Sequence, residues 1–91
     1  MARRTVYDIY ADVLRYVAIR PGCRISYIAR YSNLPLDRAN RVLMDMVKAN
    51  LIRLEYKRGV KTYTVTERGY EYLELYKRLK RLLTPILGEE L

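Results

Sequence analysis

The sequence predicts an α+β fold in which three helices are followed by a two-stranded hairpin and a fourth helix. Apolar residues recur at helical spacing in four segments, and between the third and the fourth the spacing changes to strict alternation, as in strands. Pro, Gly and Asn, which favour turns, lie at the boundaries. The 91 residues are enough for one domain rather than two, so we assign residues 1–91 to a single domain.

The first helix is expected over residues 5–19. Thr5 is suited to the N-cap position, and Asp8 can complete a capping box with it. Pro21 and Gly22 end the helix. Two adjacent apolar stripes predict burial on two sides; they are formed by Val6, Ile9, Val13 and Val17 and by Tyr10, Leu14 and Ala18.

Two further helices are expected over residues 24–31 and 36–50, with a turn over 32–35 between them. Asp37 favours the start of the second of these helices, and Asn50 is suited to a left-handed cap at its end. Its core face is formed by Ala39, Val42, Leu43, Met46 and Val47.

A hairpin is expected over residues 51–65. Ile52, Leu54 and Tyr56 alternate with charged residues and are predicted to point inward. Residues 58–60 form a tight connection in which Gly59 takes the positive φ.

The last helix is expected over residues 66–83, with Thr66 as N-cap and Thr84-Pro85 as its end. Acidic residues lie in its first turns and basic residues in its last, so an antiparallel copy would meet opposite charges. Apolar residues follow the 4-3-4 spacing of a coiled coil and form the expected dimer interface: Tyr72, Leu75, Tyr76, Leu79, Leu82, Leu83 and Ile86.

The second and third helices with their short turn form a helix-turn-helix, and the hairpin after them is a wing. Two segments of the chain resemble archaeal winged-helix DNA-binding proteins: GCRISYIARYSNLPLDRANRVLMDMVKANLI and YTVTERGYEYLELYKRL. The nearest group is the small ten-kilodalton class of dimeric chromatin-associated proteins and transcription regulators. The resemblance covers about residues 5–83. It implies a homodimer joined by an antiparallel coiled coil of the last helix, and a glycine, Gly69, where helix and hairpin pack closely.

The composition, independently of the resemblance, favours some classes of function and excludes others. The chain has 18 Lys and Arg against 10 Asp and Glu, a net charge of +8, which favours a polyanion such as nucleic acid as partner. With no His and one Cys, it lacks the ligands of a zinc or iron–sulfur site and the usual catalytic base. We therefore expect no metal, no cofactor and no enzymatic activity.

The location expected from the sequence is the cytoplasm, in association with the nucleoid. A single cysteine cannot form an internal disulfide, which suits a reducing compartment. No apolar run approaches the length of a membrane span, and no signal peptide is evident, so no membrane partner is expected. The absence of Gln, His and Trp indicates a thermophilic source.

Candidate base contacts lie on the outer face of the third helix, because a major groove admits one helix. Arginine can pair with guanine, and asparagine with adenine. The alternative is that Arg38 and Arg41 are solvated residues paired with Asp37 and Asp45. The candidates are Arg38, Arg41, Asn40 and Lys48, and Met44 lies on the same face.

Candidate phosphate contacts lie on the second helix and the wing, where six of the eight net positive charges fall. On the helix they are Arg24, Ser26, Tyr27, Arg30 and Tyr31, although the tyrosines have ordinary packing as an alternative role. On the wing they are Lys57, Arg58 and Lys61, which suit a minor groove or flanking phosphates unless the turn is merely exposed and charged.

These features favour a homodimeric binder of double-stranded DNA that regulates transcription or associates with chromatin. The alternative from another class is a protein–protein adaptor in a larger transcription or replication assembly. Binding of RNA or single-stranded DNA through the ten tyrosines is a third possibility. An enzyme is the least supported, because no paired acid–base groups, activated nucleophile or phosphate-binding glycine loop is evident.

Overall fold

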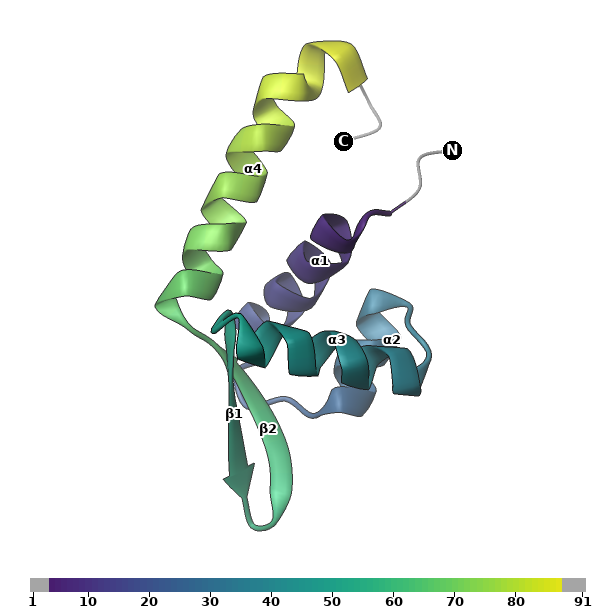
Figure 1. The fold of residues 1–91 in the computed structure, drawn as a ribbon, viewed down its shortest axis with the longest axis vertical. Helices are drawn as coiled ribbons and strands as arrows, with labels where there is room; N and C mark the ends of the chain where they lie inside the picture. The colour runs from purple at the N-terminus through teal and green to yellow at the C-terminus, as the bar shows by residue number, and fades with distance from the viewer. Residues whose placement is uncertain (1–3, 88–91) are drawn as a thin grey trace.

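The computed structural model describes residues 4–87, and of residues 85–87 the backbone alone. It contains four helices and one antiparallel hairpin in the predicted order (Figure 1). Their bounds are α1 Val6–Ile19, α2 Ile25–Ser32, α3 Leu36–Lys48, β1 Ile52–Lys57, β2 Val60–Val65 and α4 Glu67–Leu87. The α+β winged helix-turn-helix fold predicted from the sequence is confirmed.

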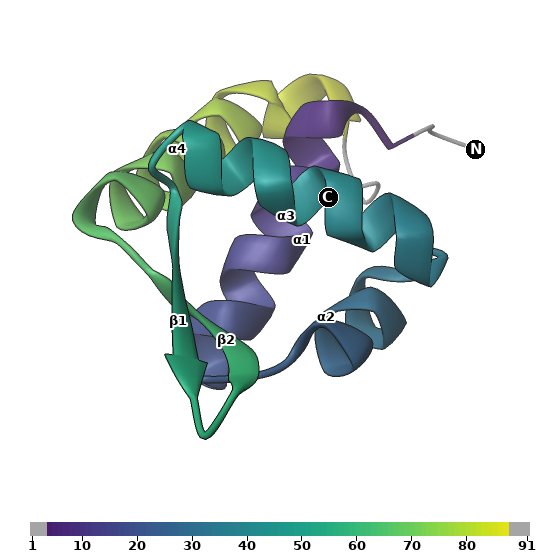
Figure 2. The same cartoon turned by 60° about the horizontal axis from the view of Figure 1, so that its bottom comes forward.

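Helix α1 lies at the centre, with the other helices and the hairpin around it (Figure 2). The predicted capping box is present: the Asp8 amide donates to the Thr5 hydroxyl at 3.2 Å, and the Thr5 amide donates to the Asp8 carboxylate at 2.8 Å. Val13, Leu14 and Val17 are fully buried, because α2, α4 and β2 all pack against this helix. Burial on two sides therefore follows from its central position.

Helices α2 and α3 are joined by a turn in which Asn33 adopts the left-handed conformation, with φ of 56°. Leu34 in the same turn is buried against Ile9, Ala29 and Ala39, and these contacts fix α3 relative to α2. At the other end of α3, Asn50 also has a positive φ, 61°, as expected for the residue after a helix cap.

The hairpin has Ile52 opposite Val65 and Lys57 opposite Val60. Arg58 and Gly59 alone form its turn, both with positive φ of 52° and 78°, which matches the right-handed twist of paired strands. Strand β2 also pairs with Cys23, which was not expected from the sequence. The Tyr63 amide donates to the Cys23 carbonyl oxygen at 3.1 Å. The segment before α2 is thus tied to the wing.

Gly69 near the start of α4 allows this helix to pack on the hairpin. A β-carbon at this position would overlap the Leu51 carbonyl oxygen and would lie 2.7 Å from Cγ1 of Val65. The Gly69 amide donates to the Thr66 hydroxyl at 3.0 Å, so Thr66 acts as the predicted N-cap. The close packing of helix and hairpin expected at Gly69 is confirmed.

The predicted end of the last helix at Thr84-Pro85 is wrong, because α4 continues to Leu87. The Thr84 hydroxyl donates to the Lys80 carbonyl oxygen at 3.0 Å. Pro85 cannot donate to the Arg81 carbonyl, but Arg81 is exposed in the final turns, where carbonyl groups can bond to water instead. With 21 residues, α4 is about 31 Å long.

Helix α4 and the hairpin project from opposite ends of the molecule, which measures 48 × 27 × 21 Å (Figure 1). Only the first half of α4 packs on the core, where Leu73 is 7% exposed, whereas Leu82 is 77% exposed. Within the described residues, no helix is long and apolar enough to cross a membrane. The fold therefore presents two separate surfaces, one around α3 and the wing and one along α4.

Candidate nucleic-acid interface

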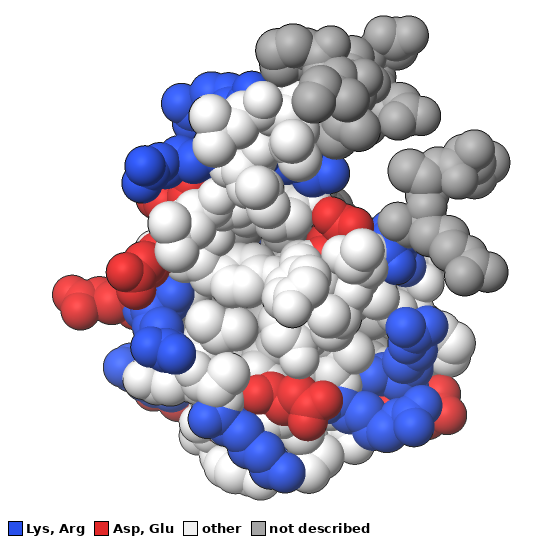
Figure 3. Space-filling model, turned by 45° about the horizontal axis from the view of Figure 1, so that its top comes forward, with Lys and Arg blue, Asp and Glu red and all other residues white. Residues whose placement is uncertain are grey.

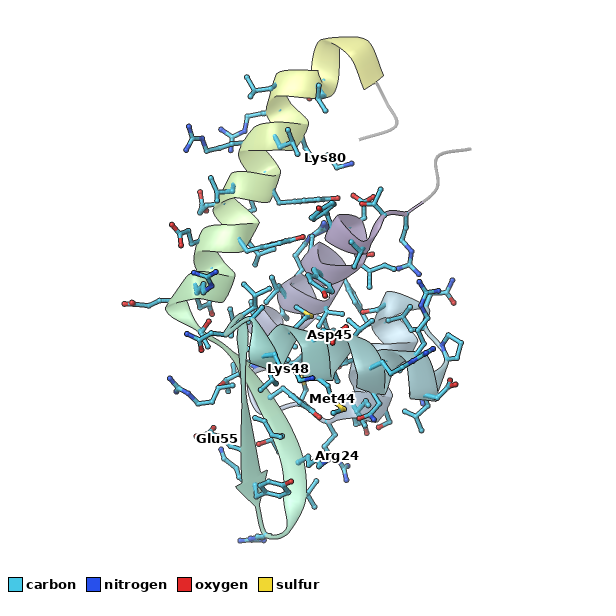
Figure 4. The ribbon with its side chains drawn as sticks, in the orientation of Figure 1. Arg24, Met44, Asp45, Lys48, Glu55 and Lys80 are labelled. Atoms are coloured by element: carbon cyan, nitrogen blue, oxygen red, sulfur yellow. The ribbon has the colours of Figure 1, made fainter. Side chains whose placement is uncertain are left out.

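The outer surface of α3 is exposed and faces solvent beside the wing. Figure 4 shows Met44 and Lys48 on the side of α3 nearer the hairpin, with Asp45 on the other side, toward α1. A shallow hollow of about 240 Å³ separates α3 from the hairpin. It is lined by Asn40, Leu43, Met44, Val47, Lys48, Leu54, Lys61 and Tyr63.

Among the residues that the structure describes, the basic residues of α3 have no carboxylate partner. Arg38, Arg41 and Lys48 are all exposed, and none of the ion pairs found in the described part of the chain includes a residue of α3. Arg38 and Arg41 are thus solvated, as the alternative to base contact expects, but they do not pair with Asp37 and Asp45. By helical position, Arg41 lies on the outer face between the two flanks, and Arg38 shares the flank of Asp45.

The exposed residues of α2 form a cluster around Tyr27. The guanidinium carbons of Arg24 and Arg30 lie 6.0 and 5.8 Å from the centre of its ring, at distances typical of cation–π contacts. Tyr31 instead contacts Tyr16 of α1, with ring centres 4.9 Å apart and the ring planes tilted by 31°. Tyr27 and Tyr31 therefore each pack against neighbouring side chains while about half of each side chain remains exposed. Ser26 is exposed as well.

Arg24 connects this cluster to the wing. Figure 4 places Arg24 beside the hairpin and below Met44 and Lys48. Arg20 and Arg24 also line a hollow of about 670 Å³ between the end of α1 and the start of α2. Arg24, Lys48 of α3 and Lys61 of the wing thus lie around the space between α3 and the hairpin.

The wing distributes its cations over both faces. Lys61 is opposite Tyr56 on the face that also carries Leu54 and Tyr63 and turns toward α3. Lys57 alternates with Tyr56 and so points to the opposite face, and Arg58 lies in the turn. Tyr56 was predicted to point inward, but it is 64% exposed because the end of the hairpin extends beyond the helices.

The residues predicted for the dimer interface divide into two groups. Tyr72 and Tyr76 are half-buried against α1: the Tyr72 hydroxyl donates to the Tyr7 carbonyl oxygen at 2.7 Å, and the Tyr76 hydroxyl donates to Asp8. The side chain of Ile86 lies outside the described residues. The remaining residues form an exposed apolar stripe, here called the leucine stripe, which consists of Leu75, Leu79, Leu82 and Leu83.

Burial and hydrogen bonding shift the pKa values of the groups between α1 and α4. Burial raises the pKa of Tyr72 and of Tyr76 to about 12, and the hydrogen bond to Asp8 adds to the effect at Tyr76. Burial alone would raise the pKa of Asp8. It is outweighed by the hydrogen bonds from Tyr76 and Thr5 and by the charge of Lys80, which together lower the pKa. At neutral pH the contact is therefore a neutral phenol on a charged carboxylate.

The side of the molecule that carries α4 has a different character. Figure 3 shows a broad area of uncharged atoms across this side of the molecule, with basic and acidic side chains along its edge. Acidic residues lie near the start of α4, at Glu67, Glu71 and Glu74, and basic residues lie near its end, at Lys77, Arg78, Lys80 and Arg81. The leucine stripe thus runs beside two regions of opposite charge.

Sequence and structure comparisons define the class of this protein. The chain belongs to the winged helix-turn-helix family, whose sequence profile matches residues 3–84. No curated protein sequence matches it.

Among solved structures, the chain is similar to Sso10a-2, described as a DNA-binding protein from Sulfolobus solfataricus. The identity is 20% and the TM-score 0.78, over 97% of this chain and 90% of that one. It is also similar to MepR, a transcription regulator of the Staphylococcus aureus multidrug efflux pump MepA (18%, 0.70, over 91% and 67%). Streptococcus pneumoniae FabT, solved in complex with DNA, also matches (15%, 0.68, over 88% and 59%). At these identities the likeness establishes the fold alone.

Proposed function

We propose that this protein is a homodimer that binds double-stranded DNA as a transcription regulator or chromatin-associated protein. The observation that carries the proposal is that the exposed cations Arg24, Lys48 and Lys61 lie around the space between α3 and the hairpin. A helix flanked by a basic hairpin fits a major groove and the adjacent backbone.

In the proposed complex each element has a distinct role. Side chains of α3 enter the major groove, where Arg41 and Lys48 reach base edges from the outer face and Asn40 and Arg38 reach them from its two flanks. The second helix holds phosphates through Arg24 and Arg30, with the hydroxyl groups of Ser26, Tyr27 and Tyr31 as further donors. The wing contacts the flanking backbone or the minor groove through Lys57, Arg58 and Lys61.

The dimer is proposed to form through α4. The leucine stripe leaves Leu75, Leu79 and Leu82 more than half exposed. An antiparallel second copy would cover these side chains and would bring the acidic start of each α4 to the basic end of the other. The two copies of α3 would then address successive turns of one side of the duplex.

Location and source follow from the same proposal. A DNA-associated role implies a cytoplasmic, nucleoid-associated protein. The composition and the resemblance to archaeal winged-helix proteins favour a thermophilic archaeal source. The proposed protein uses no metal or cofactor and has no enzymatic activity.

A salt titration of duplex DNA binding tests the proposal. If five to eight phosphates are neutralised per dimer, log K should fall with log salt concentration at a slope of about −5 to −7. Binding that is absent, or that does not depend on salt, contradicts the proposal and favours the adaptor.

Two variants separate base reading from anchoring. Arg41→Ala should change the order of preference among duplex sequences, because an arginine can discriminate guanine by about 1–3 kcal/mol. Lys61→Ala should weaken binding to all sequences equally and make the slope shallower by about 2, because each dimer loses one phosphate contact per wing. Lys77→Ala on α4 removes the same charge far from the wing and is the matched control, with light scattering to verify that this variant remains dimeric. If Arg41→Ala and Lys61→Ala behave alike, the assigned roles are wrong.

A further inference from the structure

Met44 is an unexpected residue for the centre of an exposed helical face. Its side chain is 53% exposed, and the only other large apolar residue of α3 with such exposure is Leu36 at the first position of the helix. Its neighbours on the outer face, Arg41 and Lys48, are charged. Burial in the core does not explain it, since the core face of α3 is formed by other residues, among them Leu43 and Met46.

The surroundings of Met44 form a small apolar depression with a polar rim. The hollow between α3 and the hairpin is lined by Leu43, Val47 and Leu54, and Met44 lies at its edge on the wing side of α3 (Figure 4). The rim carries the amide of Asn40 and the ammonium groups of Lys48 and Lys61. The amide nitrogen of Asn40 lies 3.9 Å from the sulfur of Met44, one helical turn away.

We infer that Met44 and this depression receive the 5-methyl group of a thymine while Asn40 pairs with a nearby adenine. The inference rests on the proposed DNA binding and adds a specificity determinant to it. The basic rim favours a polyanion, and the thymine methyl is the apolar group that DNA presents in the major groove. A flexible, polarisable thioether adapts to such a group without a fixed geometry.

Helix geometry sets the spacing of the two contacts. Asn40 and Met44 are four residues apart, which is about 6 Å along the helix. The rise of the duplex is about 3.4 Å per base pair, so the adenine and the thymine lie within one or two base steps. The preferred half-site therefore contains an A·T-rich step at the centre of the α3 contact.

Replacement of thymine by deoxyuridine tests the inference, because it removes the methyl group and leaves every hydrogen-bonding group in place. The probes are two duplexes of equal length, alternating d(A-T) and alternating d(A-U), so no operator need be known. The wild-type protein should bind the d(A-T) duplex about four-fold more tightly for each α3 that contacts it, the factor expected for one buried methyl group, and therefore about fifteen-fold more tightly as a dimer.

The variants assign the effect to Met44. Met44→Ala should bind both duplexes equally, whereas Met44→Leu, which keeps an apolar side chain, should retain the preference. Asn40→Ala should retain the methyl preference and lose discrimination between A·T and G·C pairs. The side chains of Met44 and Asn40 are exposed, so these changes should leave the folded structure intact.

The outcomes distinguish this inference from the proposed function. Equal binding of both duplexes by the wild-type protein overturns the inference alone, as does an undiminished preference in Met44→Ala. Absence of binding to either duplex overturns the proposed function as well. If Met44→Ala instead abolishes binding to a protein partner while DNA binding is unchanged, Met44 belongs to a protein-docking surface.

Discussion

At the scale of single residues, Asp8 and Tyr76 connect α1 to α4. Asp8 caps α1 through Thr5, accepts a hydrogen bond from Tyr76, and lies 3.7 Å from the ammonium of Lys80. One carboxylate thus organises the start of one helix and the orientation of another. Because these partners hold the pKa of Asp8 below its usual value, the contact should make the stability of the fold depend on pH.

Asp8→Asn should lower the free energy of unfolding by about 1 kcal/mol at neutral pH. Since the pKa of Asp8 is lower in the folded than in the unfolded state, its contribution is complete above about pH 4. It is lost as the pH falls through the folded-state value. Urea unfolding at several pH values should show the difference between wild type and variant shrinking below about pH 4. A difference that is constant with pH would contradict the assigned role of the carboxylate.

Gly69 gives a second prediction at the residue scale. Helix propensity alone predicts that Gly69→Ala stabilises the protein by about 1 kcal/mol. The structure predicts the opposite, because the new methyl group would meet the Leu51 carbonyl oxygen and Val65. We expect a loss of about 2–3 kcal/mol in the free energy of unfolding, measured by urea denaturation. A gain in stability would mean that α4 and the hairpin are less tightly packed than described.

At the scale of secondary-structure elements, α4 has two distinct environments along its length. Its first half packs on α1 and the hairpin through Gly69, Leu73 and Tyr76, whereas its second half extends into solvent. The leucine stripe lies beside the packed face rather than on it. A second copy can therefore reach the stripe without displacing the contacts within the chain.

Leu79→Lys should convert the proposed dimer into a monomer, because it places a charge in the centre of the leucine stripe. Tyr70→Lys, on the opposite side of α4 and also exposed, is the matched control and should remain dimeric. Light scattering after size-exclusion chromatography measures the mass directly. A wild-type protein that is monomeric at tens of micromolar concentration would refute the interface.

At the scale of the whole molecule, the two surfaces lie at opposite ends of a body 48 Å long. The wing and α3 can contact a duplex while α4 contacts a second copy, so the two interactions do not compete. Loss of the dimer in Leu79→Lys should therefore weaken DNA binding through lost bivalency and not through altered base contacts. The order of preference among duplex sequences should be the same in the monomer.

The sequence by itself determined the order and type of the elements, because hydrophobic periodicity and turn residues act locally. It also identified Thr5, Thr66 and Gly59, whose roles depend only on nearby residues. The end of α4 was misjudged, since an exposed final turn tolerates Pro85 where a buried one would not.

Only the tertiary structure decided how apolar positions are shared between the core and the exposed surface. The 4-3-4 apolar patterns of α4 include Tyr72, Leu75, Tyr76 and Leu79. In the structure α1 covers the two tyrosines and leaves the two leucines exposed. The tertiary structure likewise joined Cys23 to β2 and placed Lys61 and Met44 around one depression. Within residues 4–84, whose side chains are described, it left Arg41 without a carboxylate partner. These features depend on which elements meet in space, and periodicity along a single chain does not carry that information.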